Sequence, residues 1–284
     1  MYYLPKYNGI ADGIQYVKGM IAMGKAEDMK RFEGQTAIIT GGGTGMGRAA
    51  ALRLGREGAN VVIAGRREKE LQEVYEEIVS KGGRALAVQT DVADPRQVEA
   101  LVNKTLDTFG SLDMAWNNAG ILGAFSPVHK LSFEDFDTLM SVNLRGVFAC
   151  LKYEIAAMLD LGIQGSIVNT SSWTAHGAMP GTSGYAASKG ALDAMTRTVA
   201  LEVGPSNIRV NNVSPGMIAT PMSQEVLSDE TSARPFVKQT PLQRVGQSED
   251  VADAVVWLLS DDARFVTGQS ILVDGGYTIG GLRP

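Results

Sequence analysis

Ser172, Tyr185 and Lys189 are the residues whose types and spacing most clearly permit chemistry. Tyr185 and Lys189 stand four positions apart in Tyr-Ala-Ala-Ser-Lys, so on a helix they share one face about one turn apart. A free tyrosine, with a pKa of about 10, transfers protons poorly near neutral pH. A neighbouring ammonium lowers that pKa, so the pair predicts an acid/base group. An ordinary surface pair is the alternative, and the rest of the chain must decide between them.

The elements that would position these residues alternate along the chain from residue 35 onward. Short apolar runs are separated by stretches with helical spacing, which is typical of a parallel sheet covered on both faces. We therefore expect an α/β fold with one doubly wound, seven-stranded parallel sheet of the Rossmann type, and helices on both faces. The expected strands are 36–40, 61–64, 85–88, 112–116, 166–169, 208–213 and 270–273. The expected helices are 68–80, 95–109, 133–161, 185–203 and 248–260.

Residues 1–34 precede this pattern and form an expected N-terminal extension to a single domain at residues 35–284. Ile10, Ile14, Val17 and Ile21 are spaced as one apolar stripe of a helix, although nearby glycines weaken the pattern. We expect a partly helical segment that packs on the domain or on a neighbouring subunit. The segment has the features of neither a secretory signal nor a membrane span.

The composition argues against several classes of function. A formal net charge of −5 over 284 residues gives no reason to expect nucleic acid or an anionic membrane as a partner. The single cysteine, Cys150, fits a reducing compartment. The two histidines, His129 and His176, lack a cysteine cluster, so we expect no metal. A soluble cytoplasmic protein is the expected class.

A glycine cluster, Thr40-Gly-Gly-Gly-Thr-Gly-Met-Gly47, follows the first expected strand and opens a helix. Glycines there permit a tight turn and let the backbone approach a pyrophosphate. The free N–H groups at the helix start attract its negative charge. Because the cluster stands at the first strand-to-helix turn, it predicts a dinucleotide site.

The end of the second expected strand, Ala64-Gly65-Arg66-Arg67, would lie beside the adenosine ribose. A carboxylate there would accept from the ribose 2′-hydroxyl and favour NAD, but Gly65 replaces it. The donors of an arginine suit a 2′-phosphate, so we favour NADP, with NAD as the alternative. Arg66 and Arg67 could instead form a solvated helix start. Asp91, after the third strand, could accept from the adenine amino group.

Five motifs together resemble the short-chain dehydrogenase/reductase family, in its order and spacing, over residues 34–276. They are the glycine pattern TGxxxGxG at Thr40–Gly47, Asn117-Asn-Ala-Gly120, Asn143, Ser172 with Tyr185-x-x-x-Lys189, and Pro215-Gly216. The resemblance implies a nicotinamide-dependent oxidoreductase that interconverts a secondary alcohol and a ketone.

The resemblance also assigns roles to four residues. Tyr185 would exchange a proton with the substrate, and Ser172 would hydrogen-bond the substrate oxygen. Lys189 would hold the nicotinamide ribose and depress the tyrosine pKa. Asn143 would interrupt its helix and hold a water that extends a proton relay from the lysine.

Further positions match the family's cofactor contacts, although the Asn-Asn-Ala-Gly turn could equally be structural. The cofactor positions are Gly41, Thr44, Gly45, Met46, Gly47, Arg66, Arg67, Asp91, Val92, Asn118, Ala119, Gly120, Tyr185, Lys189, Pro215, Gly216, Ile218 and Thr220. A lid over the substrate is expected at about 217–240. The residues expected around the substrate are largely apolar. These substrate-pocket residues are Leu122, Phe125, Trp173, His176, Met179, Met217 and Met222.

The apolar character of that pocket favours a hydrophobic or cyclic substrate over a sugar phosphate. A reductase of 3-oxoacyl thioesters on the same scaffold is the alternative activity. A non-catalytic cofactor-binding protein is disfavoured because Ser172, Tyr185 and Lys189 are all present. His176, as a lone histidine, could also be structural or solvated. The family resemblance further implies a homotetramer.

Overall fold

The protein is built on one sheet of seven parallel strands in the order β3-β2-β1-β4-β5-β6-β7. The computed structural model describes residues 30–279. The strand order reverses between β1 and β4, which is where an open α/β sheet forms a binding crevice. The predicted doubly wound fold is confirmed. The strands are β1 (Thr36–Thr40), β2 (Asn60–Gly65), β3 (Arg84–Gln89), β4 (Met114–Asn117), β5 (Ser166–Thr170), β6 (Arg209–Pro215) and β7 (Ser270–Val273).

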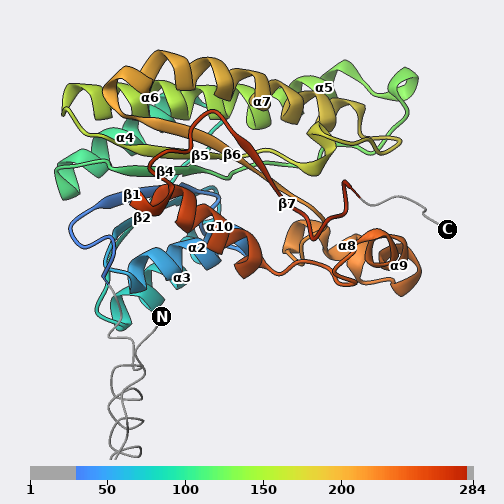
Figure 1. Ribbon diagram of the computed structural model, residues 1–284, viewed down its shortest axis with the longest axis horizontal. Helices are drawn as coiled ribbons and strands as arrows, with labels where there is room; N and C mark the ends of the chain where they lie inside the picture. The colour runs from blue at the N-terminus through green and yellow to red at the C-terminus, as the bar shows by residue number, and fades with distance from the viewer. Residues whose placement is uncertain (1–29, 280–284) are drawn as a thin grey trace, which may run out of the picture.

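Helices cover both faces of the sheet (Figure 1). On one side α2, α3 and α10 pack on it, and on the other side α4, α6 and α7. No helix in residues 30–279 is long and apolar enough to cross a bilayer. The helices are α2 (Gly45–Arg56), α3 (Glu68–Ser80), α4 (Pro95–Phe109), α5 (Phe133–Met140), α6 (Val147–Asp160), α7 (Ser183–Val203), α8 (Gln224–Leu227), α9 (Glu230–Gln239) and α10 (Ser248–Leu259).

The central strand β1 has apolar side chains on both faces because both faces are covered. In β1, Ile39 packs in the core under α2 and α10, whereas Ile38 packs in the core under α4 and α6. Every β1 residue is buried. This explains why the sequence of β1 shows adjacent apolar residues rather than an alternating pattern.

The predicted long helix over 133–161 is divided in the structure. The α-helices α5 and α6 are joined by a π-helical turn, η2 (Ser141–Gly146). Asn143 lies in this turn with a fully buried side chain that pairs with the backbone of Ile121. Helical periodicity does not reveal a π turn, because the turn displaces the apolar stripe by only one residue.

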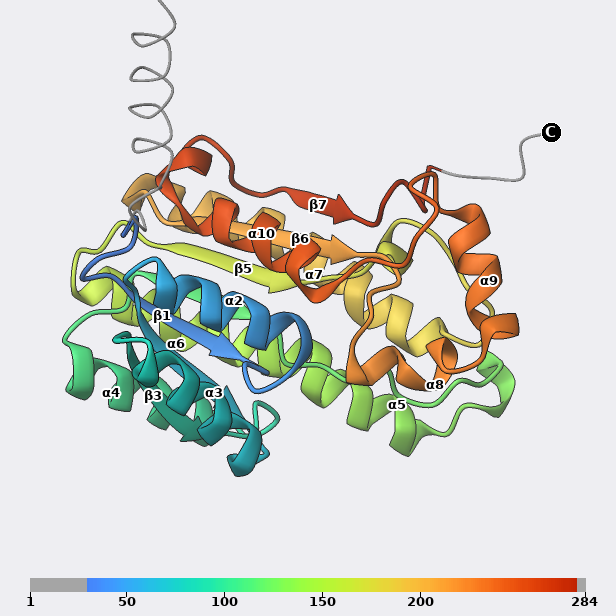
Figure 2. The ribbon, with the colours of Figure 1, turned by 90° about the horizontal axis from the view of Figure 1, so that it is seen from below.

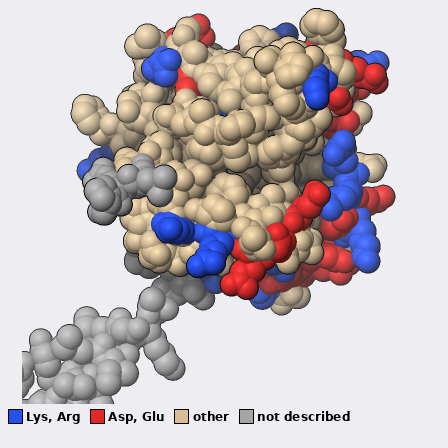
Figure 3. All heavy atoms as spheres, turned by 90° about the vertical axis from the view of Figure 1, so that its right-hand side faces the viewer, with Lys and Arg blue, Asp and Glu red and all other residues tan. Residues whose placement is uncertain are grey.

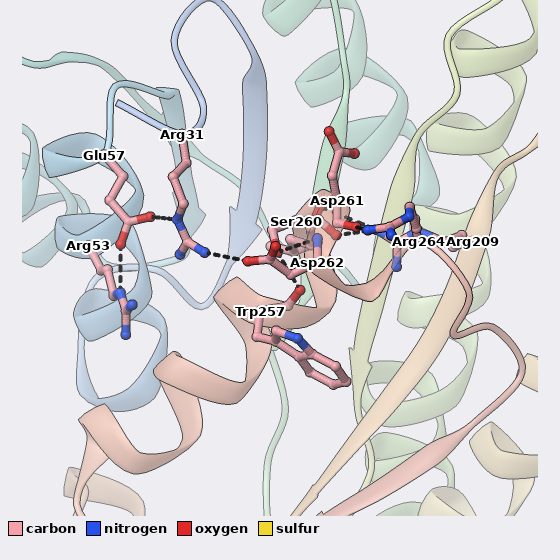
Figure 4. A network of polar contacts seen from close by, with 10 residues as sticks. Arg31, Arg53, Glu57, Arg209, Trp257, Ser260, Asp261, Asp262 and Arg264 are labelled. Carbon is pink, nitrogen blue, oxygen red and sulfur yellow. Dashed lines mark hydrogen bonds and ion pairs between the residues drawn. The ribbon is translucent and has the colours of Figure 1, made fainter. Parts of the chain in front are cut away.

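The chain entering β1 is already part of the packed domain. Phe32 is 2% exposed and belongs to the core under α2 and α10. The Arg31 guanidinium donates to the Glu57 carboxylate at 2.7 Å and to Asp262 at 3.3 Å, and Arg53 donates to Glu57 at 2.8 Å (Figure 4). These contacts join the entry segment to α2 and to the turn after α10. The helix predicted over residues 10–21 lies outside the described residues.

The arrows of β1, β5, β6 and β7 point toward the side of the molecule where α8 and α9 lie (Figure 2). These helices, with the short turn η5 (Pro221–Ser223), occupy the segment predicted as a lid. The carboxyl ends of the strands and this helical segment therefore face one another across the end of the sheet, where loops of α/β proteins form binding sites.

Candidate active site

A cavity of about 940 Å³ lies at the carboxyl ends of the strands. Its wall includes the glycine turn after β1, the ends of β2 and β3, the start of α7, and the α8–α9 segment. At this end of the molecule uncharged side chains cover the centre and charged ones gather toward the margins (Figure 3). The cavity is large enough for a dinucleotide and a small substrate together.

The glycine turn has the shape that a pyrophosphate requires. Gly41 and Gly45 have φ angles of +65° and +54°, a region that favours glycine. A Cβ on Gly47 would lie 2.3 Å from the Gly41 carbonyl oxygen, so only glycine lets the helix approach the turn. Because α2 begins at Gly45, its first N–H groups have no intrahelical partner and are available to an anion. Gly41, Thr44, Gly45 and Met46 line the cavity, whereas Gly47 is buried behind them.

Both arginines after β2 reach the cavity wall but differ in their contacts. Arg67 donates to the Thr44 hydroxyl at 3.0 Å and pairs with Glu70 at 3.1 Å. The Arg66 side chain makes no hydrogen bond or ion pair with any described residue. Among the described residues, the guanidinium of Arg67 is thus engaged by Thr44 and Glu70, whereas that of Arg66 is not engaged.

The Asn-Asn-Ala-Gly turn after β4 both holds two strands together and forms part of the cavity wall. The Asn118 amide donates to the Thr40 and Gly41 carbonyl oxygens at 3.2 and 3.3 Å, which ties β4 to the end of β1. Asn118, Ala119 and Gly120 also line the cavity. The remaining predicted cofactor positions on the wall are Asp91, Val92, Pro215, Gly216, Ile218 and Thr220.

Ser172, Tyr185 and Lys189 converge on the same cavity. Ser172 lies two residues after the end of β5, and its hydroxyl accepts from the Thr174 backbone N–H at 3.1 Å and from the Thr174 hydroxyl at 3.0 Å. Tyr185 and Lys189 lie one turn apart on α7, with the Lys189 Nζ 5.6 Å from the centroid of the Tyr185 ring. The Lys189 ammonium donates to the Thr170 carbonyl oxygen at 2.7 Å. The sequence spacing therefore does bring these three residues together.

The electrostatics of the pair differ from the expectation that the lysine lowers the tyrosine pKa. Burial raises the pKa of Tyr185, and a contact with the Ser172 hydroxyl offsets only part of that rise. Burial also lowers the pKa of Lys189 to about 8, against the opposing effect of the Asp193 carboxylate. Removal from water is thus the largest influence on the pKa of both groups.

Asn143 does not line the cavity, although it was predicted to hold a relay water near the lysine. Its Oδ1 accepts from the Ile121 N–H at 2.9 Å, and its Nδ2 donates to the Ile121 carbonyl oxygen at 2.8 Å. A Cβ on Gly120 would lie 3.3 Å from Asn143 Oδ1 and 3.7 Å from Lys189 Nζ, so both groups adjoin Gly120. The described contacts make Asn143 the residue that fixes the Ile121 backbone at the cavity floor.

His176 is also absent from the cavity wall, contrary to its predicted place around the substrate. Its Nε2 lies 3.2 Å from the Ser214 hydroxyl and 3.3 Å from the Asp193 carboxylate. The short turn η3 (Trp173–Ala175) places Trp173 and Thr174 on the cavity wall, whereas His176, which follows the turn, is not part of that wall. A loop position alone could not predict this direction.

The other predicted pocket residues do line the cavity, namely Leu122, Phe125, Trp173, Met179, Met217 and Met222. Phe236 of α9 joins them and was not predicted. Tyr277 packs behind Trp173 edge-on, with ring centroids 4.8 Å apart, and stacks on Phe236 at 5.8 Å. The C-terminal segment thereby connects the pocket wall to the lid.

Thr174, which the sequence also predicts at the mouth of the pocket, lines the cavity and supports the Ser172 hydroxyl. The sequence analysis missed one polar residue near the site, Asp193, a carboxylate only 8% exposed on α7. Asp193 stands four residues after Lys189, so the helical spacing that paired Tyr185 with Lys189 could also have placed Asp193 on that inner face.

Comparisons with known proteins agree with this geometry. A family model described as "Enoyl-(Acyl carrier protein) reductase" matches residues 41–278. A cyclohexanol dehydrogenase of Acinetobacter sp. (strain SE19) is 42% identical over 248 residues, covering 87% of this chain and 96% of the relative. A 3beta-hydroxysteroid dehydrogenase of Eggerthella lenta is 40% identical over 249 residues, covering 87% and 95%.

Solved structures show the same similarity. The crystal structure of levodione reductase superposes with a TM-score of 0.84 at 36% identity, covering 88% of this chain and 99% of that one. A short-chain type dehydrogenase/reductase from Mycobacterium marinum gives 0.83 at 34% identity, covering 88% and 98%. The chain belongs to the short-chain dehydrogenase/reductase family. It is an oxidoreductase of the alcohol dehydrogenase type, which acts on CH–OH groups.

Proposed function

We propose that this protein interconverts a cyclic or otherwise hydrophobic secondary alcohol and its ketone, with NADP as the preferred cofactor. The observation that carries the proposal is that Ser172, Tyr185 and Lys189 line the same cavity as the glycine turn. A proton-transfer group and a dinucleotide site in one cavity are what this reaction requires.

The roles of the residues follow from their positions. A bound nicotinamide supplies the hydride acceptor or donor. Tyr185 takes the alcohol proton in oxidation and donates it in reduction, while the Ser172 hydroxyl orients the substrate oxygen. Lys189, as an ammonium, stabilises the phenolate form of Tyr185 once a ligand has excluded water, and binds the ribose hydroxyls. Asn143 fixes the backbone of Ile121 through two hydrogen bonds. It thereby fixes the part of the cavity wall that lies beside Lys189.

Two observations support a cyclic, apolar substrate. The side chains expected around the substrate, including Leu122, Trp173 and Met179, are apolar and line the cavity. The named relatives include dehydrogenases of cyclohexanol, of a dichlorocyclohexadiene diol and of a steroid. Met222 and Phe236 would close over such a ring from the lid segment.

The preference for NADP rests on the end of β2. Gly65 offers no carboxylate to a ribose 2′-hydroxyl, and Arg66 has a guanidinium without a described partner. That donor fork suits a 2′-phosphate. NAD remains the alternative, and the NADP preference is tested by the arginine variants in the Discussion.

A reductase acting on acyl thioesters is the second candidate, and the description of the matching family model favours it. The two candidates differ in what must reach Tyr185, a free ketone or a thioester on a carrier. We further propose a cytoplasmic homotetramer. Phe148, Leu159 and Leu201 lie exposed on α6 and α7, the outer helices that would pair between subunits.

The deciding experiment is a panel of cyclic ketones and alcohols, linear ketones and acyl thioesters, each assayed with both cofactors by the absorbance of the reduced nicotinamide. Turnover of cyclic ketones with a higher kcat/KM than thioesters supports the proposal. Exclusive turnover of thioesters would replace it with the second candidate. Light scattering of the same preparation gives the subunit number.

A further inference from the structure

A row of three buried asparagines crosses the sheet below the active site. Asn117 of β4, Asn169 of β5 and Asn212 of β6 stand opposite one another in register. The Asn117 amide donates to Asn169 Oδ1 at 3.1 Å, and the Asn169 amide donates to Asn212 Oδ1 at 3.2 Å. The Asn212 amide donates in turn to Asp193 Oδ1 at 2.9 Å. The three amide dipoles therefore point the same way and end on one carboxyl group of α7.

The hydrogen bonds at Asp193 suit a carboxylate. Its Oδ1 also accepts from the Ser171 hydroxyl at 2.7 Å and from the Ser270 hydroxyl at 2.9 Å. Three donors on one oxygen suit an ionised group, which only accepts. A chain of aligned hydrogen bonds in a buried environment strengthens each member and adds to this effect. The negative charge is thus held in place by groups from β6, β7 and the segment after β5.

Lys189 is the cation that this charge can reach. It stands one turn before Asp193 on α7, is 3% exposed, and makes its described hydrogen bond to the Thr170 carbonyl oxygen rather than to a carboxylate. The Ser171 hydroxyl contacts both the Asp193 carboxylate and the Lys189 carbonyl oxygen, at 2.7 and 3.2 Å. Burial opposes the ammonium, lowering the pKa of Lys189, and the charge of Asp193 acts in the other direction.

The other groups that face Lys189 and Asp193 come from several elements of the fold. Lys189 is faced by the Tyr185 phenol, by the Thr170 backbone of β5 and, across Gly120, by the neutral amide of Asn143. His176, on the segment after β5, is the one described titratable group besides Lys189 in the surroundings of Asp193. Its Nε2 contacts both Asp193 and Ser214, so the same nitrogen serves both partners. A nucleophile-activating serine, histidine and aspartate would use the two ring nitrogens separately.

We propose that Asp193 is a positioning residue for the reaction: its carboxylate, held by the asparagine row, keeps the Lys189 amine in its charged form beside Tyr185. This rests on the proposed function of Tyr185 and Lys189. Both directions of that reaction involve the phenolate, as reactant in oxidation and as product in reduction. Loss of the ammonium charge therefore slows both directions.

The test is the pH dependence of ketone reduction by Asp193→Asn. An asparagine can keep the oxygen that accepts from Ser171, Asn212 and Ser270, so this change removes the charge and retains the hydrogen bonds. We expect the alkaline limb of kcat/KM to move about one pH unit lower. The matched control is Glu202→Gln, which removes one carboxylate from an exposed position of the same helix and should leave the limb where it is.

A second readout separates this proposal from the proposed function. Cofactor binding, followed by tryptophan fluorescence across the same pH range, should also weaken at a lower pH in Asp193→Asn, and it requires no turnover. Binding and kinetic profiles that match those of the wild type would overturn the proposal. A wild type that reduces no ketone would overturn the proposed function alone, because the binding profile still tests Asp193.

Asn212→Ser serves as a second variant should Asp193→Asn fail to fold. It removes the amide that donates to the Asp193 carboxylate, so both pH profiles should shift in the same direction by less. An Asn212→Ser protein with unshifted profiles would refute the role of Asp193.

Discussion

The Lys189 ammonium lies 5.6 Å from the centroid of the Tyr185 ring and donates its hydrogen bond elsewhere, to the end of β5. The two residues are therefore neighbours without a direct hydrogen bond in the ligand-free protein. Burial raises the pKa of Tyr185 and lowers the pKa of Lys189, so it opposes the charged form of each group. The pair becomes an efficient acid/base only when a ligand fills the cavity and brings further charge or donors to it.

Removing the phenolic oxygen should separate chemistry from binding. We expect Tyr185→Phe to lower kcat for ketone reduction by about a thousandfold, because positioned proton transfer contributes that order of rate. Cofactor affinity, measured by fluorescence titration, should change less than about threefold, since the ring and Lys189 remain. Tyr75→Phe on α3, which also deletes one phenolic oxygen, is the control. Activity retained in Tyr185→Phe would exclude this tyrosine as the proton donor.

The buried charge of Lys189 should lower the free energy of unfolding although it is needed for activity. Its folded pKa of about 8 lies below the ordinary value, so the folded chain binds fewer protons between those values and gains stability as pH rises through them. Below about pH 8 the full penalty remains. Lys189→Met should therefore abolish turnover yet raise the free energy of unfolding at neutral pH by about 1–2 kcal/mol, after loss of the Thr170 hydrogen bond. Urea unfolding at neutral and alkaline pH would measure this, with exposed Lys152→Met as the control. A variant less stable than the wild type at neutral pH would contradict the buried charge.

The two arginines after β2 should contribute unequally to cofactor choice. Arg66 has no described partner, whereas Arg67 is held by Thr44 and Glu70. We expect Arg66→Ala to reduce kcat/KM for NADPH, relative to NADH, by roughly tenfold to a hundredfold, the size of a lost charge-assisted hydrogen bond. Arg67→Ala removes the same charge and should change the ratio less. Equal ratios in the wild type and both variants would show that neither arginine reads a 2′-phosphate.

The sheet could be predicted from sequence because each strand is a short apolar run that needs both faces covered. The expected run at 166–169, for example, is β5 apart from one residue at its end. The proximity of Tyr185 and Lys189 could also be predicted, because they share one helix, where spacing alone determines which side chains are neighbours. Local periodicity was sufficient in both cases.

Features that depend on contacts between distant segments could not be predicted in this way. Asn143 sits in a π turn because its amide pairs with Ile121, which comes from another loop. The asparagine row exists only once β4, β5 and β6 pair in register, and no single strand reveals it. The direction of His176 likewise depends on Ser214 and Asp193, residues distant in the chain.

Glu154 of α6 is the carboxyl group at the end of the asparagine row opposite to Asp193. Its carboxyl is 1% exposed and accepts from the Asn117 amide at 2.9 Å, and burial raises its pKa to about 7. A raised carboxyl pKa means that the folded chain binds more protons, so stability falls as pH rises from about 4 to about 7 and the penalty persists above that.

Glu154→Gln should remove that penalty. Its amide can still accept from Asn117, and it offers a donor to the Asn117 Oδ1, which lacks a hydrogen-bond partner among the described residues. We expect this variant to be more stable than the wild type by about 2 kcal/mol in urea unfolding at about pH 8, and about equal at about pH 4.5. Exposed Glu99→Gln on α4 should show neither change. A Glu154→Gln protein with the same stability difference at both pH values would mean that Glu154 binds protons equally in the folded and unfolded chains, and would contradict the raised pKa.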